Sequence, residues 1–142
     1  MSDLHGYYLE DLSVGMRASI AKTVSEADVY GFAGITGDNN PVHINAEYAA
    51  TTMFKDRIAH GMLSAGFISA VLGTKMPGPG AIYVEQQLKF KAPVKIGDTV
   101  TAEAIIESID ERRRRVVLKT NCLVGDKIVA EGQATLMVDS RN

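Results

Sequence analysis

The chain has 142 residues, which is enough for a single domain, 1–142, built around one hydrophobic core. Hydrophobic residues make up 46% of the sequence, charged residues make up 23%, and the formal net charge is −2. This balance argues against a basic surface for nucleic acid, and a chain with no tryptophan and 6% aromatic residues has little to stack on bases.

The N-terminal residues, 1–6, lack the basic start and apolar run of a secretory signal peptide. The longest apolar-leaning run, Met62 to Gly73, is interrupted by serines and glycine and is shorter than the roughly 18 residues that a membrane span needs. The single cysteine, Cys122, cannot form an internal disulfide, which fits a reducing compartment. We therefore expect a soluble cytoplasmic protein without a membrane segment.

After a short lead-in, the first part of the chain is expected to consist of helices and loops. Ser25 is a suitable N-cap for a helix with an acidic first turn, and Gly37 is expected to end that helix. An irregular loop over 38–44 follows and leads to a short helix around 46–52.

The next predicted helix, 60–75, is the most apolar part of the sequence. Apolar residues cover nearly its whole circumference, so we expect protein to surround it on all sides. The Met-Pro-Gly-Pro-Gly segment at 76–80 ends it.

From Ala81 onward the sequence alternates between apolar and polar residues as strands do. Strands are predicted over 81–90, 99–109, 114–124 and 127–138. Gly125 and Asp126 form a suitable hairpin turn between the last two. Helices followed by antiparallel strands indicate an α+β protein. A long buried central helix wrapped by a curved antiparallel sheet of four or five strands is the hot-dog fold, which we predict here.

The predicted loop after the first helix carries the residues with the clearest chemistry. Asp38 and His43 lie five residues apart, and Pro41 stiffens the backbone while pushing Asn40 toward an extended conformation. Such a loop can point a carboxylate and an imidazole into one cavity, where together they hold a water molecule. Asn40 can orient one of the two through its amide. Asp and Asn before proline are also ordinary turn formers, so this spacing alone leaves a simple loop hydrogen bond open.

Three blocks of the sequence resemble one enzyme family. Residues 36–43, Thr-Gly-Asp-Asn-Asn-Pro-Val-His, resemble the G-D-x-N-P-[apolar]-H signature of the MaoC-like (R)-specific enoyl-CoA hydratases, also called hydratase 2. The blocks 49–63 and 80–98 also resemble this family, the second of them in a form that many hot-dog proteins share. The similarity extends over about 12–138. One departure is Asn45, where Asp or Ser is more usual, but it lies beyond the signature.

The resemblance implies the addition of water to a trans-2-enoyl-CoA, giving an (R)-3-hydroxyacyl-CoA. Asp38 and His43 would form the catalytic dyad. An imidazole suits proton removal from water near neutral pH, while Asp38 would hold that water and return a proton to the substrate. The two roles can also be exchanged, because neighbouring titrating groups act as a coupled pair.

Gly61, at the start of the apolar helix, is the predicted third catalytic group. A helix N-terminus offers unpaired N–H groups, and a glycine lets a substrate carbonyl approach closely. The Gly61 N–H would then stabilise negative charge on the thioester oxygen. A purely structural role, in which Gly61 only lets the loop enter the helix, is the alternative.

Substrate-binding roles follow for Asn40 and, on the apolar helix, for Ser69, Val71 and Leu72. The last three would surround the acyl group, although Ser69 can equally bond to its own preceding turn. Similarity to short polyhydroxyalkanoate-linked hydratases suggests short acyl chains. No cofactor is expected, because coenzyme A is part of the substrate. No metal is expected either, since the His and Cys residues show no ligand spacing.

Several other charged and polar residues have open roles. The basic run 111–115 can contact coenzyme A phosphates or form a solvated turn, and Lys89 and Lys91 are alternative phosphate partners. Cys122 is expected to serve in packing. His5, near the terminus, is expected to be solvated.

A single sheet of this kind has an open edge, which together with the family resemblance predicts a homodimer or a higher homo-oligomer with its site near the subunit boundary. Two other functions compete with hydration. A hot-dog thioesterase would hydrolyse the same substrate class, but it usually lacks the loop over 38–43. A non-catalytic acyl-CoA-binding or scaffold subunit would not need the dyad.

Overall fold

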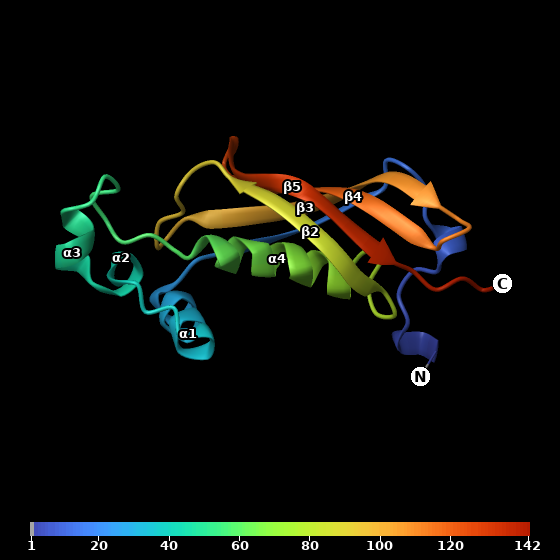
Figure 1. The fold of residues 1–142 in the computed structure, drawn as a ribbon, viewed down its shortest axis with the longest axis horizontal. Helices are drawn as coiled ribbons and strands as arrows, with labels where there is room; N and C mark the ends of the chain where they lie inside the picture. Colours follow the sequence, from blue (N-terminus) through green and yellow to red (C-terminus); the bar gives the residue numbers. More distant parts are fainter. Residues whose placement is uncertain (1) are drawn as a thin grey trace.

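The computed structural model describes residues 2–142 as an α+β protein in which a five-stranded antiparallel sheet curves over one long helix, α4. The strands lie in the order β1-β3-β4-β5-β2 (Figure 1). This is the predicted hot-dog fold. Two 3-10 helices, Ser2–Leu4 and Leu9–Asp11, precede the elements β1 Arg17–Thr23, α1 Glu26–Thr36, α2 Pro41–Ile44, α3 Ala46–Ala50, α4 Gly61–Thr74, β2 Ile82–Phe90, β3 Thr99–Asp110, β4 Arg115–Val124 and β5 Lys127–Met137.

The middle of the sheet follows from strict alternation in the sequence. In β3 the side chains of Val100, Ala102, Ala104 and Ile106 are buried, and their neighbours point to the other face. The Gly125-Asp126 turn joins β4 to β5, with Gly125 at a φ of 60° that favours glycine. The predictions of all four C-terminal strands are confirmed to within a residue or so at each end.

The strand β1 was not predicted, because we expected only helices and loops in this part of the chain. Arg17–Thr23 pairs antiparallel with β3 along its whole length. It is an edge strand with no fully buried side chain, so its alternation of apolar and polar residues is weak. Pairing with β3, rather than a local pattern, makes this segment a strand.

The helix α4 has the predicted bounds but not the predicted surroundings. Its sheet-facing side chains Ser64, Ile68, Val71 and Leu72 are buried in the core. The opposite face is open in the single chain, where Met62 is 59% exposed. The expectation that protein surrounds α4 on all sides is therefore wrong for one chain, because the sheet covers only one side of the helix (Figure 1).

The three short helices gather at one end of the sheet, away from both termini (Figure 1). Ser25 caps α1 through a reciprocal pair of hydrogen bonds with Asp28, and Gly37 ends the helix in a left-handed conformation, as predicted. The irregular loop predicted over 38–44 is wrong in its second half. Proline is favourable at the first position of a helix, so Pro41 begins α2.

None of the helices within 2–142 combines the length and apolar character needed to cross a membrane.

Candidate active site

Three ionisable side chains meet where the end of α1, the helix α2 and the start of α4 come together. Asp38 follows α1, His43 lies in α2, and His60 immediately precedes α4. One ligand atom from each, a carboxylate oxygen or an imidazole nitrogen, lies within 4.8 Å of the other two. The structure therefore brings the predicted pair Asp38 and His43 together and adds His60, to which the sequence analysis assigned no role.

The imidazole of His43 is held in one tautomer. Its Nδ1 lies 2.7 Å from the carbonyl oxygen of Ile58, and a carbonyl can only accept a hydrogen bond. Nδ1 therefore carries the proton and Nε2 has the free lone pair. The ring is 8% exposed, so it is fixed by its surroundings yet reachable from solvent. A neutral His43 is thus prepared to accept a proton at Nε2.

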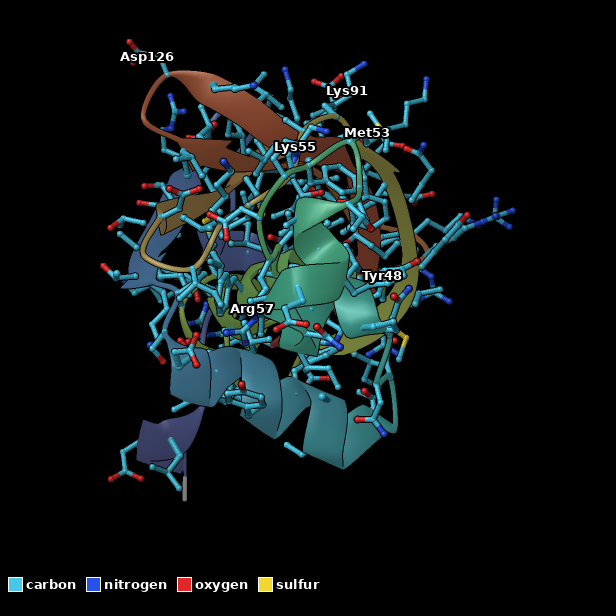
Figure 2. All side chains as sticks on the ribbon, turned by 90° about the vertical axis from the view of Figure 1, so that its left-hand side faces the viewer. Tyr48, Met53, Lys55, Arg57, Lys91 and Asp126 are labelled. Atoms are coloured by element: carbon cyan, nitrogen blue, oxygen red, sulfur yellow. The ribbon has the colours of Figure 1, made fainter. Side chains whose placement is uncertain are left out.

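Arg57 holds the helix that carries His43, and the sequence analysis did not identify it. Its Nε donates to the His43 carbonyl oxygen over 2.7 Å, and its Nη1 pairs with the carboxylate of Glu26 in α1. Figure 2 looks onto this end of the molecule and shows Arg57 above α1. Arg57 lies within the block 49–63, but a single arginine there gives no sequence signal for a contact with residues of α1 and α2.

Asn40 makes one hydrogen bond toward each member of the dyad, and each bond involves a backbone N–H. Its side-chain oxygen accepts from the Val42 N–H and so caps α2, while its own N–H lies 3.3 Å from a carboxylate oxygen of Asp38. Asp38 itself is exposed. The structure therefore gives Asn40 a position between Asp38 and His43, where it holds the α2 start and one carboxylate oxygen.

The ring of His60 is enclosed at the centre of the cluster. It is 2% exposed and stacks on His43 with ring centroids 3.8 Å apart and an interplanar angle of 26°. Phe32 of α1 lies against it with a centroid separation of 4.8 Å. Nε2 of His60 lies 3.0 Å from the carbonyl oxygen of Asp38, so this nitrogen carries the proton.

Gly61 is the first residue of α4, so its backbone N–H has no acceptor within the helix. A Cβ atom placed on Gly61 would lie 3.0 Å from the ring of Phe90. The close approach of Phe90 therefore requires glycine or a shift of that ring. This feature was not predicted, because the two residues are far apart in the sequence.

A largely apolar cavity of about 520 Å³ adjoins Gly61. Its polar lining includes His60, Ser64 and Lys91, and Figure 2 shows Lys91 next to Met53. Asp38 and His43 do not line it, and the cavity meets the dyad through His60. The main apolar side chains that line it are Met53, Phe54, Ile58, Met62, Phe90 and Val129.

The three predicted acyl-binding residues of α4 do not line this cavity. Val71 and Leu72 are fully buried beneath the sheet, and Ser69 lies on the exposed face of the helix. Ser64, one turn from Gly61, is the α4 serine that reaches the cavity. Successive residues of a helix point in directions 100° apart, and in α4 apolar residues occupy nearly all of these directions. The sequence therefore did not indicate which positions face the sheet and which face the cavity.

The cluster of Asp38, His43 and His60 has the residue types of a metal site, and the sequence spacing did not reveal it. Metal ligation uses the imidazole lone pairs, which lie in the ring planes. Nδ1 of His43 and Nε2 of His60 are already hydrogen-bonded to carbonyl oxygens, which leaves one nitrogen of each ring for another partner.

Cys122 and the basic run are placed away from the chemistry. Burial raises the pKa of the Cys122 thiol to about 12, and its Sγ lies 3.5 Å from the Ser64 carbonyl oxygen, which agrees with a packing role. Residues 111–114 of the run form the β3–β4 turn at the end of the sheet opposite α1, and Arg115 begins β4 (Figure 1). Of the alternative phosphate partners, Lys91 lines the cavity, while Lys89 does not.

His5 is not a solvated residue as expected. Its Nε2 lies 3.1 Å from a carboxylate oxygen of Asp139, its Nδ1 lies 3.0 Å from the Gly6 carbonyl oxygen, and its ring stacks on Tyr8. His5 therefore joins the two ends of the chain, far from the site.

Comparison with known proteins gives consistent matches over nearly the whole chain. Residues 12–130 match the family described as MaoC like domain. The chain is 60% identical to the (R)-specific enoyl-CoA hydratase of Rhodospirillum rubrum over 98% of its length and 96% of that protein. The structure is similar to that of the R-hydratase PhaJ1 from Pseudomonas aeruginosa, with a TM-score of 0.90, 42% identity and coverage of 96% and 88% of the two chains. The (R)-hydratase from Aeromonas caviae involved in PHA biosynthesis follows with a TM-score of 0.88, 38% identity and coverage of 91% and 98%.

Proposed function

The chain belongs to the MaoC-like family, and we propose from this that it is an (R)-specific enoyl-CoA hydratase. The reaction adds water to the double bond of a trans-2-enoyl-CoA and yields the (R)-3-hydroxyacyl-CoA. The observation that carries the proposal is the convergence of the Asp38 carboxylate with a His43 ring whose Nε2 is free to accept a proton.

Asp38 and His43 are close enough to share one water molecule. Two hydrogen bonds of about 2.8 Å that meet at one oxygen join acceptors roughly 4.5–5 Å apart. The Asp38 and His43 atoms lie within 4.8 Å of each other. A water molecule between them can donate one hydrogen to each group, and its oxygen lone pair then points away from both, toward a substrate carbon.

The proposed reaction leaves the dyad unchanged after each turnover. The water oxygen forms a bond to C3 while Nε2 of His43 takes one of its protons. The electron pair of the double bond moves toward the thioester carbonyl. The dyad then returns one proton to C2, which restores its starting charge. Since Asp38 and His43 titrate as a pair, the proton that reaches C2 can leave from either group.

The Gly61 N–H is the proposed partner of the thioester oxygen. Negative charge develops on that oxygen as water attacks, and a fixed N–H donor stabilises it without reorganisation. The N-terminal end of α4 adds a partial positive charge in the same place. The cavity beside Gly61 can receive an apolar part of the substrate, with Lys91 near its wall as a partner for a coenzyme A phosphate. Coenzyme A arrives with the substrate, and no other cofactor is proposed.

A homodimer is part of the proposal. Apolar side chains are exposed on the edge strand β2, with Ile82 at 53% and Val84 at 50%, and on the open face of α4, where Met62 is 59% exposed. A second copy covering this surface would bury it and would enclose Ser69, which a single chain leaves exposed. We place the enzyme in the cytoplasm, where the Cys122 thiol stays reduced.

Turnover of crotonyl-CoA tests the proposal. Hydration removes the absorbance of the conjugated enone without releasing a thiol, and chiral analysis should give the (R) product. Thiol release would instead support a thioesterase, and the absence of any turnover would support a non-catalytic acyl-CoA-binding subunit.

A series of substrates from about four to twelve carbons would test the proposed preference for short chains. Light scattering on an eluting peak measures the oligomeric state.

A further inference from the structure

We infer that His60 is a positioning residue that holds both members of the dyad from one neutral imidazole ring. The inference rests on the proposed function, because it assigns a role within the same site. It starts from the position of His60 at the junction of α1, α2 and α4, where one ring contacts Asp38 through an edge and His43 through a face.

The first contact fixes the loop that carries Asp38. Nε2–H of His60 donates to the Asp38 carbonyl oxygen over 3.0 Å. The loop 38–40 otherwise rests on short-range bonds, such as that from the Asp38 N–H to the Thr36 hydroxyl. The His60 bond is its tie to α4, and through α4 to the sheet. Without it, the Asp38 carboxylate is expected to move relative to His43.

The second contact fixes the direction of the free His43 lone pair. The Ile58 carbonyl holds one edge of the His43 ring, but rotation about that hydrogen bond would still swing Nε2. The His60 ring lies flat against the His43 ring at 3.8 Å and prevents this rotation. Phe32, on His60 itself, supports it in turn. The stacking thereby limits how far Nε2 of His43 can swing.

The hydrogen bonds indicate that His60 is neutral. Nδ1 is buried and finds no hydrogen-bond partner within residues 2–142, so a proton there would be both buried and unpaired. The charged groups around the cluster are Asp38 in the loop, Arg57 bound to the His43 carbonyl, and Lys91 of the cavity wall. When His43 takes a proton from water it becomes a cation. A neutral ring beneath it accepts this charge on its face, whereas a second imidazolium at this distance would repel it.

A role in helix capping or simple packing does not explain these contacts. His60 is the N-cap residue of α4, yet its side chain makes no capping bond to that helix. A packing role would be met by any apolar ring, which would not need a donor directed at the Asp38 carbonyl. The combination of a flat face and one N–H is specific to a neutral imidazole or a similar ring.

Nitrogen NMR of the wild-type protein labelled at histidine tests the tautomers without any substitution. The chain has three histidines, and a His5→Gln variant identifies the signals of the third. We expect His43 with its proton on Nδ1 and His60 with its proton on Nε2. A charged His60, or one protonated on Nδ1, would overturn the inference.

Kinetics of two complementary variants test the positioning role. His60→Phe keeps a flat face and loses the donor, while His60→Gln keeps a donor and loses the face. Each is expected to lower kcat by about 10- to 100-fold with little change in KM, because the reacting groups are displaced while binding remains. Cys122→Ala is the matched control, since it removes packing against the same first turns of α4.

The outcomes separate this inference from the proposed function. If the wild type does not hydrate enoyl-CoA, the proposed function is refuted, but the NMR experiment still tests the tautomers of His43 and His60 independently of activity. If the wild type is active and both His60 variants keep the kcat of Cys122→Ala, the positioning role is wrong. A rise in KM with unchanged kcat would also overturn it and make His60 a wall of the cavity. Should both variants fail to fold, the wild-type tautomers decide.

Discussion

The sheet with α4 and the helical segment 25–60 are held together by different forces. The sheet encloses a continuous apolar core in which residues such as Val100, Leu118 and Leu136 are buried almost completely. The helical segment buries few side chains and depends instead on caps, on Arg57 and on the stacked histidines. The comparison teaches that the stability of this chain resides mainly in one region and its proposed chemistry in the other.

The strongest test of this division is to remove the chemistry while keeping the fold. Asp38→Asn or His43→Gln should lower kcat by about 10²–10⁴-fold, which is the usual contribution of a general acid or base. Asp38 is exposed and the sheet core is distant, so the melting temperature of Asp38→Asn should change little, whereas His43→Gln also loses the stacking on His60 and should melt somewhat earlier. Hydration rates and thermal unfolding measure the two effects. Full activity of either variant would contradict the assignment of the dyad.

The reverse test weakens the core and leaves the site intact. Leu118→Ala removes a fully buried side chain from β4, so the free energy of unfolding should fall by about 2–5 kcal/mol. Denaturant unfolding measures this loss. The kcat of the remaining folded protein should stay near that of the wild type, and a large drop would show that the two regions are more tightly coupled than their contacts suggest.

A milder change sharpens the comparison within the helical segment. Asn40→Ala removes the cap of α2 and should cost about 1 kcal/mol locally, because the Val42 N–H loses its acceptor. Asn45→Ala is a matched control, since Asn45 caps α3 in the same way through the Tyr48 N–H. Both variants should lose similar stability, but Asn40→Ala should lose more kcat. Equal kcat values would show that the α2 cap does not position His43.

The smallest expected effect lies at the far end of the sheet, where pH acts on the chain ends. Hydrogen bonding to the Gly6 carbonyl, followed by that to Asp139, raises the pKa of His5 above its ordinary value of 6.5. A raised native pKa means that the protonated form stabilises the fold. This contribution is complete below about pH 6.5 and is lost as the pH rises through the higher native value.

Melting temperatures of the wild type and His5→Gln, measured between about pH 5.5 and 8.5, check this effect. The wild type should have the advantage at low pH, and the difference should shrink as the pH rises. A difference that is constant with pH would mean that the His5–Asp139 contact does not depend on charge. The hydration rate should not follow this titration, because His5 is far from the dyad.

Sequence patterns predicted the four C-terminal strands, including the edge strand β2, but missed the other edge strand, β1. Alternation of apolar and polar residues predicted β3, and runs of strand-forming residues predicted β4 and β5, all of which bury part of their side chains. The edge strand β1 has little buried surface and was missed. The exposed face of α4 was also missed. An apolar sequence indicates that a helix is buried, but it does not indicate whether the same chain or a second chain covers it.

The candidate site was predictable only where its residues form a short motif. Asp38 and His43 lie in one signature, and the structure places them together. Arg57 and Phe90 act through contacts with residues far away along the chain, so their roles depend on the fold. His60 was visible beside Gly61, but its bond to Asp38 and its stacking on His43 became apparent only in three dimensions.

The adjacency of His60 and Gly61 has a consequence for how such a site can change over time. Their Cα atoms are joined by one peptide unit and stay about 3.8 Å apart whatever happens around them. The backbone that carries the aligning ring therefore also carries the amide that meets the thioester oxygen, so a shift of one residue moves the other. Side chains farther along the cavity can vary to admit longer or branched acyl groups without altering this link.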